Sequence, residues 1–398
     1  MPEGWITRRA AARLIGLGGA ALAAGLPARV HAQARRGTLV LAIDISDTIT
    51  LDPGRMAQYT PPMTLNAAYA SLVTFETGNY VDVKPDLAES WARTADGRGF
   101  RFNLRDAKFA SGNPVTADDV KWTLDRVRNL KDQPALYIAN IERIEVIDAR
   151  TVDIFLKEPK EPVLGQIASS TNGIMERKVV EAQGGTAGAD TNTADKATAW
   201  LNDNSAGAGA YRLAGWQRNV QIQLVRNPHY WRGTPGFERI LIRHMSESAA
   251  QLLAVQRGDV DAAFNLIPEQ VATLKGQAGM RTERMVSLDF VYLGLTHSAE
   301  LNKALAVKEA RQAIGAAIDF DGIRDNLLGG SATRCASFFP VGMRGMKSSS
   351  KPWLIITSPI WAAAGACPPW CMWRMPSRIK PAPRPAGKAS PFPCMNPR

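Results

Sequence analysis

The stretch Thr38-Leu39-Val40-Leu41-Ala42-Ile43 is a continuous apolar run of strand length, which predicts a buried β-strand near the start of the folded chain. Three later segments alternate apolar and polar residues and therefore predict half-exposed strands. They are Phe100–Arg105, Thr151–Leu156 and Val220–Leu224. The turn residues Ala95-Asp96-Gly97 precede the first of these, so we expect it to pair with the segment before the turn.

A helix is predicted to begin at Thr116-Ala117-Asp118-Asp119, because this tetrapeptide has the form of a capping box. The hydroxyl of Thr116 can accept a backbone N–H, and the carboxylate of Asp119 can return the bond. Four apolar residues then fall on one helical face, with Trp122 off that stripe. They are Val120, Leu124, Val127 and Leu130.

The second half of the chain continues to interleave helical and extended patterns. We predict helices at Ala249–Gly258 and Val307–Ile318, and strands at Val260–Phe264 and Val291–Thr296. Strands that alternate with helices throughout a chain indicate an α/β to α+β fold class.

The net charge of +11 is carried by the two ends of the chain rather than by its middle. Residues 1–36 contain six Arg and one acid, and residues 346–398 contain eight Lys or Arg and no acid. Residues 37–345 contain 34 bases and 36 acids, so the central part is nearly neutral. A basic folded domain would suggest a nucleic-acid partner. Because the excess lies outside the folded part, we predict no nucleic-acid partner.

Residues 1–32 have the pattern of an export signal. Thr7-Arg8-Arg9 opens a charged segment, Leu14–Ala28 is uncharged and rich in Ala, Gly and Leu, and Val30-His31-Ala32 offers a small-x-small cleavage site. An apolar run of fifteen residues is shorter than the ~20 that a membrane-spanning helix needs. The twin arginine suggests Tat export and Sec is the alternative route. Either route predicts a periplasmic protein.

Residues 346–398 hold 11 of the 25 prolines, 4 of the 10 tryptophans and 3 of the 4 cysteines, with no helical or strand period. This basic composition matches neither a packed domain nor an ordinary solvated tail, so we expect the segment to be unstructured. Two explanations stay open. The tail is either a frameshifted reading of a gene whose true frame continues past about Gly345, or a real, lineage-specific extension.

The sequence contains no local motif for catalysis or for metal or cofactor binding. The four histidines lie far apart, and neither Gly-x-Ser-x-Gly nor the phosphate-binding Gly-x-x-x-x-Gly-Lys-Ser/Thr pattern occurs. Cys335 is the only cysteine before the tail, and a lone thiol is more typical of a free buried Cys than of a nucleophile. We therefore predict that the protein is not an enzyme and uses no cofactor or metal.

A series of short segments follows one another along the chain in a characteristic order. They are Leu51-Asp52-Pro53, Tyr69–Val73, Pro85–Trp91, Phe100–Arg105, Phe109–Val120, Gly207–Leu213, Arg226–Trp231 and Gly258–Asp261. Together these segments resemble the family 5 extracellular solute-binding proteins of ABC transporters, the dipeptide, oligopeptide and nickel binding group. Tyr292–Thr296 and Val307–Ile314 extend the resemblance to about residue 340.

The resemblance implies the two-lobed type II periplasmic binding protein fold, in which the lobes close on a ligand by hinge motion. It implies a monomer that binds a small solute or short peptide and delivers it to ABC permease subunits at the membrane. On this sequence it places lobe I at 37–263, with an inserted subdomain at about 80–200, and the start of lobe II at 264–345.

The resemblance also places ligand contacts of lobe I in the loop after the Leu-Asp-Pro turn and at the crossing to lobe II. We predict that Gln58, Tyr59 and Thr60 contact ligand in the loop, and that Phe264 and Asn265 do so at the crossing. Amide and phenol groups can hydrogen-bond a peptide main chain, and a phenylalanine ring can pack on a ligand side chain.

Family members are longer than this chain, and the resemblance ends where the basic tail begins, so we expect lobe II to be incomplete. In peptide-binding relatives the acid and the arginine that hold the ligand termini lie in the unmatched part. We therefore expect weak peptide binding or none. Three alternatives stay open: a receptor for a nickel complex, opine or sugar, a secreted hydrolase, and a non-functional truncated product of the family.

Overall fold

The computed structural model describes residues 37–159, 162–283 and 291–333. Their contacts separate into two units, which are described one at a time. The first contains residues 37–74 and 83–266, and the described part of the second contains 75–82 and residues from 267 to 333. The expected export signal and the basic tail lie outside the described residues. Within those residues, no helix has the length and apolar character to cross a membrane.

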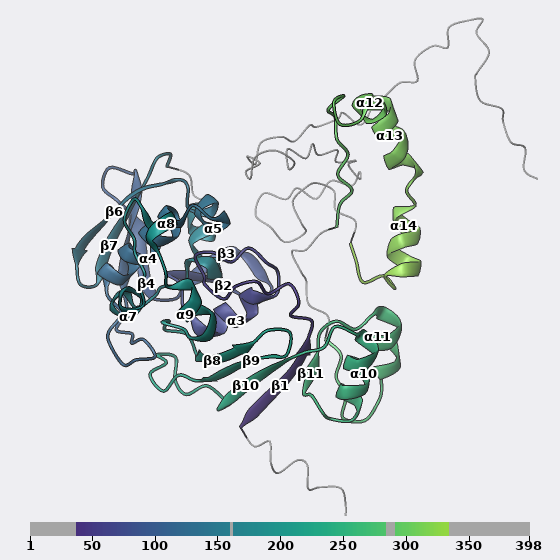
Figure 1. The fold of residues 1–398 in the computed structure, drawn as a ribbon, viewed down its shortest axis with the longest axis horizontal. Coiled ribbons are helices and arrows are strands. Elements are labelled where there is room, and N and C mark those ends of the chain that lie inside the picture. The colour runs from purple at the N-terminus through teal and green to yellow at the C-terminus, as the bar shows by residue number, and fades with distance from the viewer. Residues whose placement is uncertain (1–36, 160–161, 284–290, 334–398) are drawn as a thin grey trace, which may run out of the picture. The chain divides into compact units, whose positions relative to one another are not determined.

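The first apolar run forms β1 (Thr38–Ile43), as predicted, in a five-stranded sheet of the first unit (Figure 1). The strand order is β11-β1-β10-β9-β8, and β1 runs parallel to both of its neighbours. Val40 and Ala42 pack in one apolar cluster and Leu41 and Ile43 in another, so both faces of β1 are covered. The other strands are β8 (Tyr211–Gln217), β9 (Gln221–Arg226), β10 (Arg239–His244) and β11 (Ala262–Ala263).

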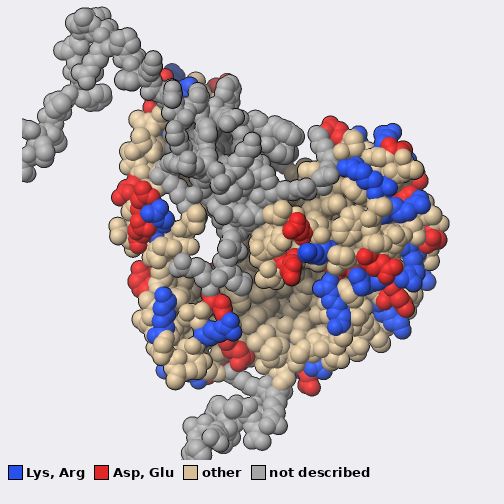
Figure 2. Space-filling model, turned by 180° about the vertical axis from the view of Figure 1, so that it is seen from behind, with Lys and Arg blue, Asp and Glu red and all other residues tan. Residues whose placement is uncertain are grey.

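A second sheet of this unit has four antiparallel strands in the order β4-β5-β7-β6 (Figure 1). The predicted turn joins the first two, with Gly97 at a φ of +68°. Phe100, Phe102 and Leu104 are buried, so the predicted alternation is confirmed. Figure 2 shows basic and acidic side chains interspersed over the surface of this part. The strands are β4 (Ala88–Arg93), β5 (Gly99–Leu104), β6 (Ile141–Asp148) and β7 (Thr151–Leu156).

Helix α4 (Ala117–Leu130) begins with the predicted capping box, and both of its hydrogen bonds are present. Val120, Leu124 and Val127 pack against the four-stranded sheet in the largest apolar cluster. Trp122 lies off that stripe but is only 6% exposed, because a second apolar cluster covers it. The helix is therefore buried on two faces, and not on one as its apolar stripe predicts.

The remaining elements of the first unit are short helices around these sheets and the start of a hairpin. They are α3 (Pro61–Ala68), β2 (Val73–Glu76), β3 (Asn79–Pro85), α5 (Gln133–Tyr137), α6 (Val163–Ile167), η1 (Ser170–Asn172), α7 (Arg177–Ala182), α8 (Thr191–Ala194), α9 (Thr198–Asp203) and α10 (Ser248–Gln256). The turn of the β2–β3 hairpin belongs to the second unit.

Apart from that hairpin turn, the regular elements in the described part of the second unit are all helices. Its helices are α11 (Pro268–Leu274), α12 (Lys303–Ala306), α13 (Lys308–Ala317), α14 (Phe320–Gly322) and η2 (Ile323–Leu327). The predicted strand at Val291–Thr296 is wrong, since this segment is irregular and Val291, Tyr292 and Leu293 are exposed. An apolar run becomes a strand only where a neighbour completes its hydrogen-bond ladder, and no described strand pairs with it.

Arg126 on α4 is fully buried and binds two carboxylates that are distant in sequence. Its Nη1 and Nη2 donate to the two oxygens of Asp52 at 2.8 and 2.7 Å, and its Nε and Nη2 donate to Asp195 at 2.8 and 2.9 Å. Burial acts to raise the pKa of Asp52, but the hydrogen bonds and charge of Arg126, with bonds from Thr198 and Gly54, outweigh it. The pKa of Asp52 is therefore held below its usual value, and the carboxylate stays charged.

Two glycines allow the chain after α9 to pass against the end of α3. A Cβ at Gly209 would lie 2.4 Å from the carbonyl oxygen of Ala67, and one at Gly207 would lie 2.2 Å from that of Ala68. The N–H of Gly209 donates to the carbonyl of Ala68 at 3.1 Å. Asn227 holds the same segment from the other side, since its side-chain N–H donates to the carbonyl of Gly209 at 2.8 Å.

Trp231 ends the segment that contains Asn227, and contacts around its ring connect this segment with the one that contains Asp86. Its ring has the guanidinium carbons of Arg105 and Arg232 at 3.9 and 4.4 Å from the ring centre. Arg232 also donates to the carboxylate of Asp86 at 2.8 Å. Burial raises the pKa of this carboxyl group although Arg232 lies beside it.

We expect Arg126→Met to lower the free energy of unfolding by about 3–5 kcal/mol, because two buried carboxylates lose their cation. The control is Lys121→Met, which breaks the partly exposed pair of Lys121 with Asp125 on the same helix. It should cost less than about 1 kcal/mol. Urea unfolding followed by circular dichroism compares the two variants, and equal losses would contradict the role given to Arg126.

Gly209→Ala should destabilise the protein by about 1–3 kcal/mol, because the new Cβ overlaps backbone atoms that cannot move aside. Gly236→Ala is the matched control, since no heavy atom lies within 4 Å of a Cβ built there and its φ is not positive. Thermal unfolding of both variants tests this expectation. A Gly209→Ala protein as stable as the Gly236→Ala protein would show that the close approach is not required.

Candidate functional site

Three neighbouring strands of the five-stranded sheet, β11, β1 and β10, run in the same direction, so their carboxyl ends lie on the same side of the sheet. In the two parallel pairs around β1, Ile43 lies opposite His244 and Ala42 lies opposite Ala263. Ligands of open α/β sheets bind outside the carboxyl ends of the strands. We call the residues at these ends, with the loop segment bonded to them, the carboxyl edge. It consists of Asp44–Thr48, Tyr59, Thr60, His244, Phe264 and Asn265.

Asp47 fixes the loop segment of the carboxyl edge through backbone groups. Its Oδ2 accepts the N–H of Tyr59 at 3.0 Å and the N–H of Thr60 at 2.9 Å. The hydroxyl of Thr60 donates to the carbonyl of Asp44 at 3.4 Å. The side chain of Tyr59 takes no part in this bonding to Asp47, and the residue is 69% exposed. The loop is thus held to the end of β1 while the phenol is presented to solvent.

Asp44 directly follows the end of β1, and His244 is the last residue of the neighbouring strand β10. The bonds from Ser46 hold the pKa of Asp44 below its usual value, so its carboxylate is charged at neutral pH. The Nδ1 of His244 accepts the N–H of Ile45 at 3.2 Å and lies 3.6 Å from Asp44. Because Nδ1 is the acceptor in this bond, it carries no proton there, and no hydrogen bond joins it to the carboxylate of Asp44.

The structure brings together two of the five predicted ligand residues at Asp44. Thr60 donates to its carbonyl, and the Oδ1 of Asn265 accepts its N–H at 2.9 Å. Tyr59 adjoins Thr60, and Phe264 adjoins Asn265 with 48% of its surface exposed. The amide oxygen of Gln58 accepts the N–H of Ala57 at 3.4 Å, and no bond ties it to the carboxyl edge. Ligand contact by these five residues stays a prediction.

Sequence reasoning did not single out Asp44, Asp47, His244 or Gln251, which hold the predicted residues in place. The strand β10 was also absent from the predicted elements, because arginines at both of its ends interrupt the apolar pattern. A usable signal was present at Asp44, since polar residues directly after a buried strand lie at the ligand-binding edge of a parallel sheet.

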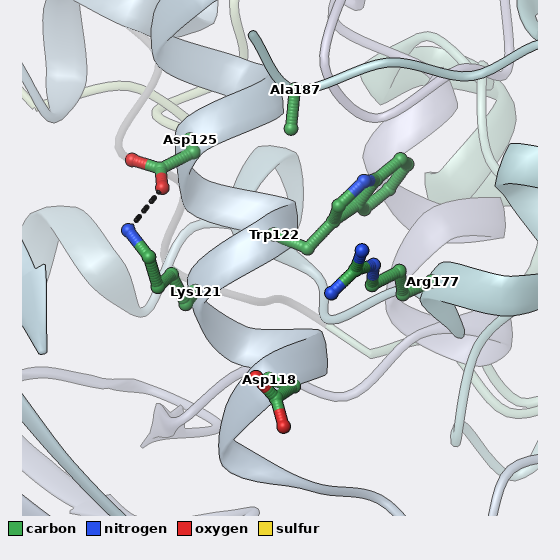
Figure 3. A pocket seen from close by; sticks show the side chains of 6 residues that line it. All are labelled: Asp118, Lys121, Trp122, Asp125, Arg177 and Ala187. Atoms are coloured by element: carbon green, nitrogen blue, oxygen red, sulfur yellow. Dashed lines mark hydrogen bonds and ion pairs between the residues drawn. The ribbon is translucent and has the colours of Figure 1, made fainter. Parts of the chain in front are cut away.

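The described surface also has a hollow of about 170 Å³ on α4 and α7, away from the residues of the carboxyl edge (Figure 3). Three of its four charged side chains already have partners, since Lys121 binds Asp125 at 2.7 Å and Arg177 binds Glu181 at 2.8 Å. We therefore assign no ligand to it. Among the described residues, no group of three or more His, Cys, Asp or Glu side chains is placed to hold a metal ion.

The sequence of this chain matches a class of extracellular proteins that bind solutes. The family model described as bacterial extracellular solute-binding proteins, family 5 Middle, matches residues 82–353. The chain therefore belongs to family 5 of the bacterial extracellular solute-binding proteins. This finding confirms the resemblance inferred from the ordered segments.

Two bacterial relatives illustrate the similarity. The probable D,D-dipeptide-binding periplasmic protein DdpA of Escherichia coli K12 is 32% identical over 325 residues, which are 80% of this chain and 60% of the relative. The di/tripeptide-binding protein 2 of Pseudomonas aeruginosa UCBPP-PA14 is 27% identical over 246 residues, 56% of this chain and 44% of the relative. The chain thus spans 60% or less of the length of these two relatives.

Solved structures confirm the type II binding-protein fold. The binding protein MoaA in complex with mannopinic acid, from A. tumefaciens R10, has a TM-score of 0.65 at 25% identity, covering 77% of this chain and 60% of that one. The OppA of Burkholderia pseudomallei has a TM-score of 0.65 at 20% identity, covering 82% and 63%. The second likeness carries the fold alone.

We expect Asp47→Ala to release the loop segment, so that the amides of Tyr59 and Thr60 exchange hydrogen about ten-fold faster or more. Asp148→Ala is the control, because this carboxylate likewise accepts a backbone N–H, that of Arg150, at 2.8 Å. Hydrogen exchange resolved by mass spectrometry measures both. Unchanged exchange at Thr60 in the Asp47→Ala protein would contradict the role of Asp47.

Proposed function

We propose that this chain is the solute-binding component of an ABC importer in the periplasm, exported by its first 32 residues, and that its solute is a short peptide. The observation that carries the proposal is the carboxyl edge, where hydrogen bonds hold two segments at Asp44 and Asp47. One is the loop with Tyr59 and Thr60, and the other is the crossing segment, which consists of Phe264 and Asn265. Membership of the family supports binding and delivery to permease subunits rather than catalysis. The relatives that are named for dipeptides and tripeptides support the class of solute.

The groups of the carboxyl edge suit a peptide. The phenol of Tyr59 and the ring of Phe264 are 69% and 48% exposed and can pack on ligand side chains. The side chain of Asp44 is charged and 35% exposed, so it can accept hydrogen bonds from ligand N–H groups. Pockets that combine a few polar groups with apolar walls are typical of small-molecule sites.

We propose that the carboxyl edge forms the lobe I side of the ligand site and that the chain crosses to lobe II from residue 264 onward. The division of contacts between Leu266 and Ile267 supports this placement of the crossing. A receptor that closes by hinge motion gains affinity only when the ligand bridges its lobes, because each lobe supplies part of the contacts.

An opine is the second candidate solute. A protein 25% identical to this chain was solved with mannopinic acid. The hydroxyl groups of an opine can donate to a carboxylate as the N–H groups of a peptide can, but its carboxylate groups cannot. The charge of Asp44 at the carboxyl edge therefore disfavours a solute that brings several carboxylates near it, and this favours a peptide.

Because the unmatched part of the family would supply further contacts, binding is expected to be weak, and we expect dipeptides to raise the melting temperature of the full chain only at concentrations well above their dissociation constant. A ligand at 100 times its dissociation constant stabilises the bound form by about 2.7 kcal/mol. This corresponds to a rise of several degrees for a domain of this size. Differential scanning fluorimetry with D-alanyl-D-alanine, L-alanyl-L-alanine, mannopinic acid and nickel–histidine compares the candidate solutes.

Phe264→Ala should abolish the shift given by a dipeptide, because the exposed ring is then lost from the ligand site. The matched control is Phe237→Ala, which removes a ring with a similar exposed fraction, 42%, from the same unit. A shift that survives in Phe264→Ala would remove this residue from the site. The absence of a shift with every peptide, together with a shift by mannopinic acid, would overturn the peptide assignment.

A further inference from the structure

The side chain of Gln251 makes four hydrogen bonds from a position on α10 that is fully buried. Its Oε1 accepts the N–H of Phe264 at 3.2 Å and the N–H of Asn265 at 3.0 Å. Its Nε2 donates to the carbonyl of Met245 at 2.7 Å and to the Oδ1 of Asn265 at 3.1 Å. A single amide thus binds both predicted ligand residues of the crossing segment.

The chemistry of the partners fixes which end of each amide is oxygen. A backbone N–H can only donate and a carbonyl can only accept, so Gln251 must present Oε1 to Asn265 and Nε2 to Met245. The same rule applies to Asn265, whose Oδ1 accepts the N–H of Asp44 at 2.9 Å. A continuous series of hydrogen bonds therefore runs from α10 through the crossing segment to the end of β1.

The support beneath Gln251 is fixed, whereas the strand before the crossing segment is short. Ala254, one turn further along α10, packs with Val40 and Ala42 of β1. By contrast, β11 has only two residues, and β1 is the only described strand with which they pair. Two ladder positions order a segment weakly, because few backbone bonds offset the conformational entropy that ordering costs. Gln251 binds the N–H groups of both Phe264 and Asn265, in addition to the bond of Phe264 to Ala42 and that of Asn265 to Asp44.

We propose that Gln251 is a positioning residue of the solute site, which holds Phe264 and Asn265 in their binding geometry without touching the solute. The proposal rests on the proposed function for its solute-binding part. A segment that is already ordered does not have to be ordered when the solute binds, so its preorganisation maintains affinity.

The test compares Gln251→Met, which keeps the length of the side chain but removes its hydrogen bonds, with Asn227→Leu. Asn227 is also a buried amide, 1% exposed, and binds Gly209 and His229 rather than the crossing segment. Hydrogen exchange at the amide of Asn265 is the direct measurement. The amide of Phe264 is less diagnostic, because it also donates to the carbonyl of Ala42 at 3.2 Å.

We expect Gln251→Met to speed exchange at Asn265 at least about ten-fold, and to weaken the binding of L-alanyl-L-alanine or D-alanyl-D-alanine by a similar factor. Asn227→Leu should leave both quantities unchanged although it lowers the unfolding midpoint. Binding is measured by isothermal titration calorimetry on the full chain. Wild-type exchange at Asn265 in Gln251→Met would overturn the proposal, and so would faster exchange with unchanged affinity.

Measurements on the wild-type protein decide two further cases, a variant that does not fold and a wild type that binds no dipeptide. If Gln251→Met does not fold, the amide of Asn265 in the wild type should still exchange at least about ten-fold more slowly than that of Leu266, for which the described residues provide no acceptor. Equal rates would overturn the proposal. If the wild type binds neither dipeptide, the proposed peptide function fails, and the exchange rates alone then decide whether Gln251 holds the crossing segment.

Discussion

The guanidinium of Arg126 lies where water cannot reach it, and the first unit is arranged so that its charge is balanced. Two carboxylates, Asp52 and Asp195, bind this cation, and a second cation, that of Arg55, lies 4.0 Å from the carboxylate of Asp52. Further donors reach both carboxylates: Thr198 and the N–H of Gly54 bind Asp52, and the N–H groups of Thr186 and Ala197 bind Asp195. The ion triad thereby joins the turn after β1, the central helix and the segment before α9.

The segments that identify the family serve mainly to hold this unit together. The Leu-Asp-Pro turn supplies Asp52 to the triad, the two glycines after α9 allow contact with α3, and Asn227 binds that glycine segment. Two arginines pack on the ring of Trp231, and both bind Asp86 in another motif, Arg232 through its carboxylate and Arg105 through its carbonyl. These contacts are independent of the solute. A shared set of motifs is therefore compatible with relatives that are named for different ligands, because these motifs build the scaffold and not the carboxyl edge.

Local signals in the sequence were sufficient for the elements that need no distant partner. The apolar run of β1, the alternation of β5 and the capping box of α4 were each predicted from a few neighbouring residues. The second buried face of α4 and the failure of Val291–Thr296 to form a strand depend on what packs or pairs from elsewhere in the chain. The same holds at the candidate site. Thr60 and Asn265 were predicted, whereas Asp47 and Gln251 act on residues 12 to 14 positions away and leave no local pattern.

The loop of the carboxyl edge is held through its main chain, since Asp47 binds the N–H groups of Tyr59 and Thr60 and not their side chains. Any residue except proline carries such an N–H group. Substitutions at Tyr59 can therefore change the surface at the carboxyl edge while the loop keeps its path, whereas Thr60 also binds the carbonyl of Asp44 through its hydroxyl. A descendant of this protein could present a different side chain at position 59 by a single point mutation, without a compensating change in the fold.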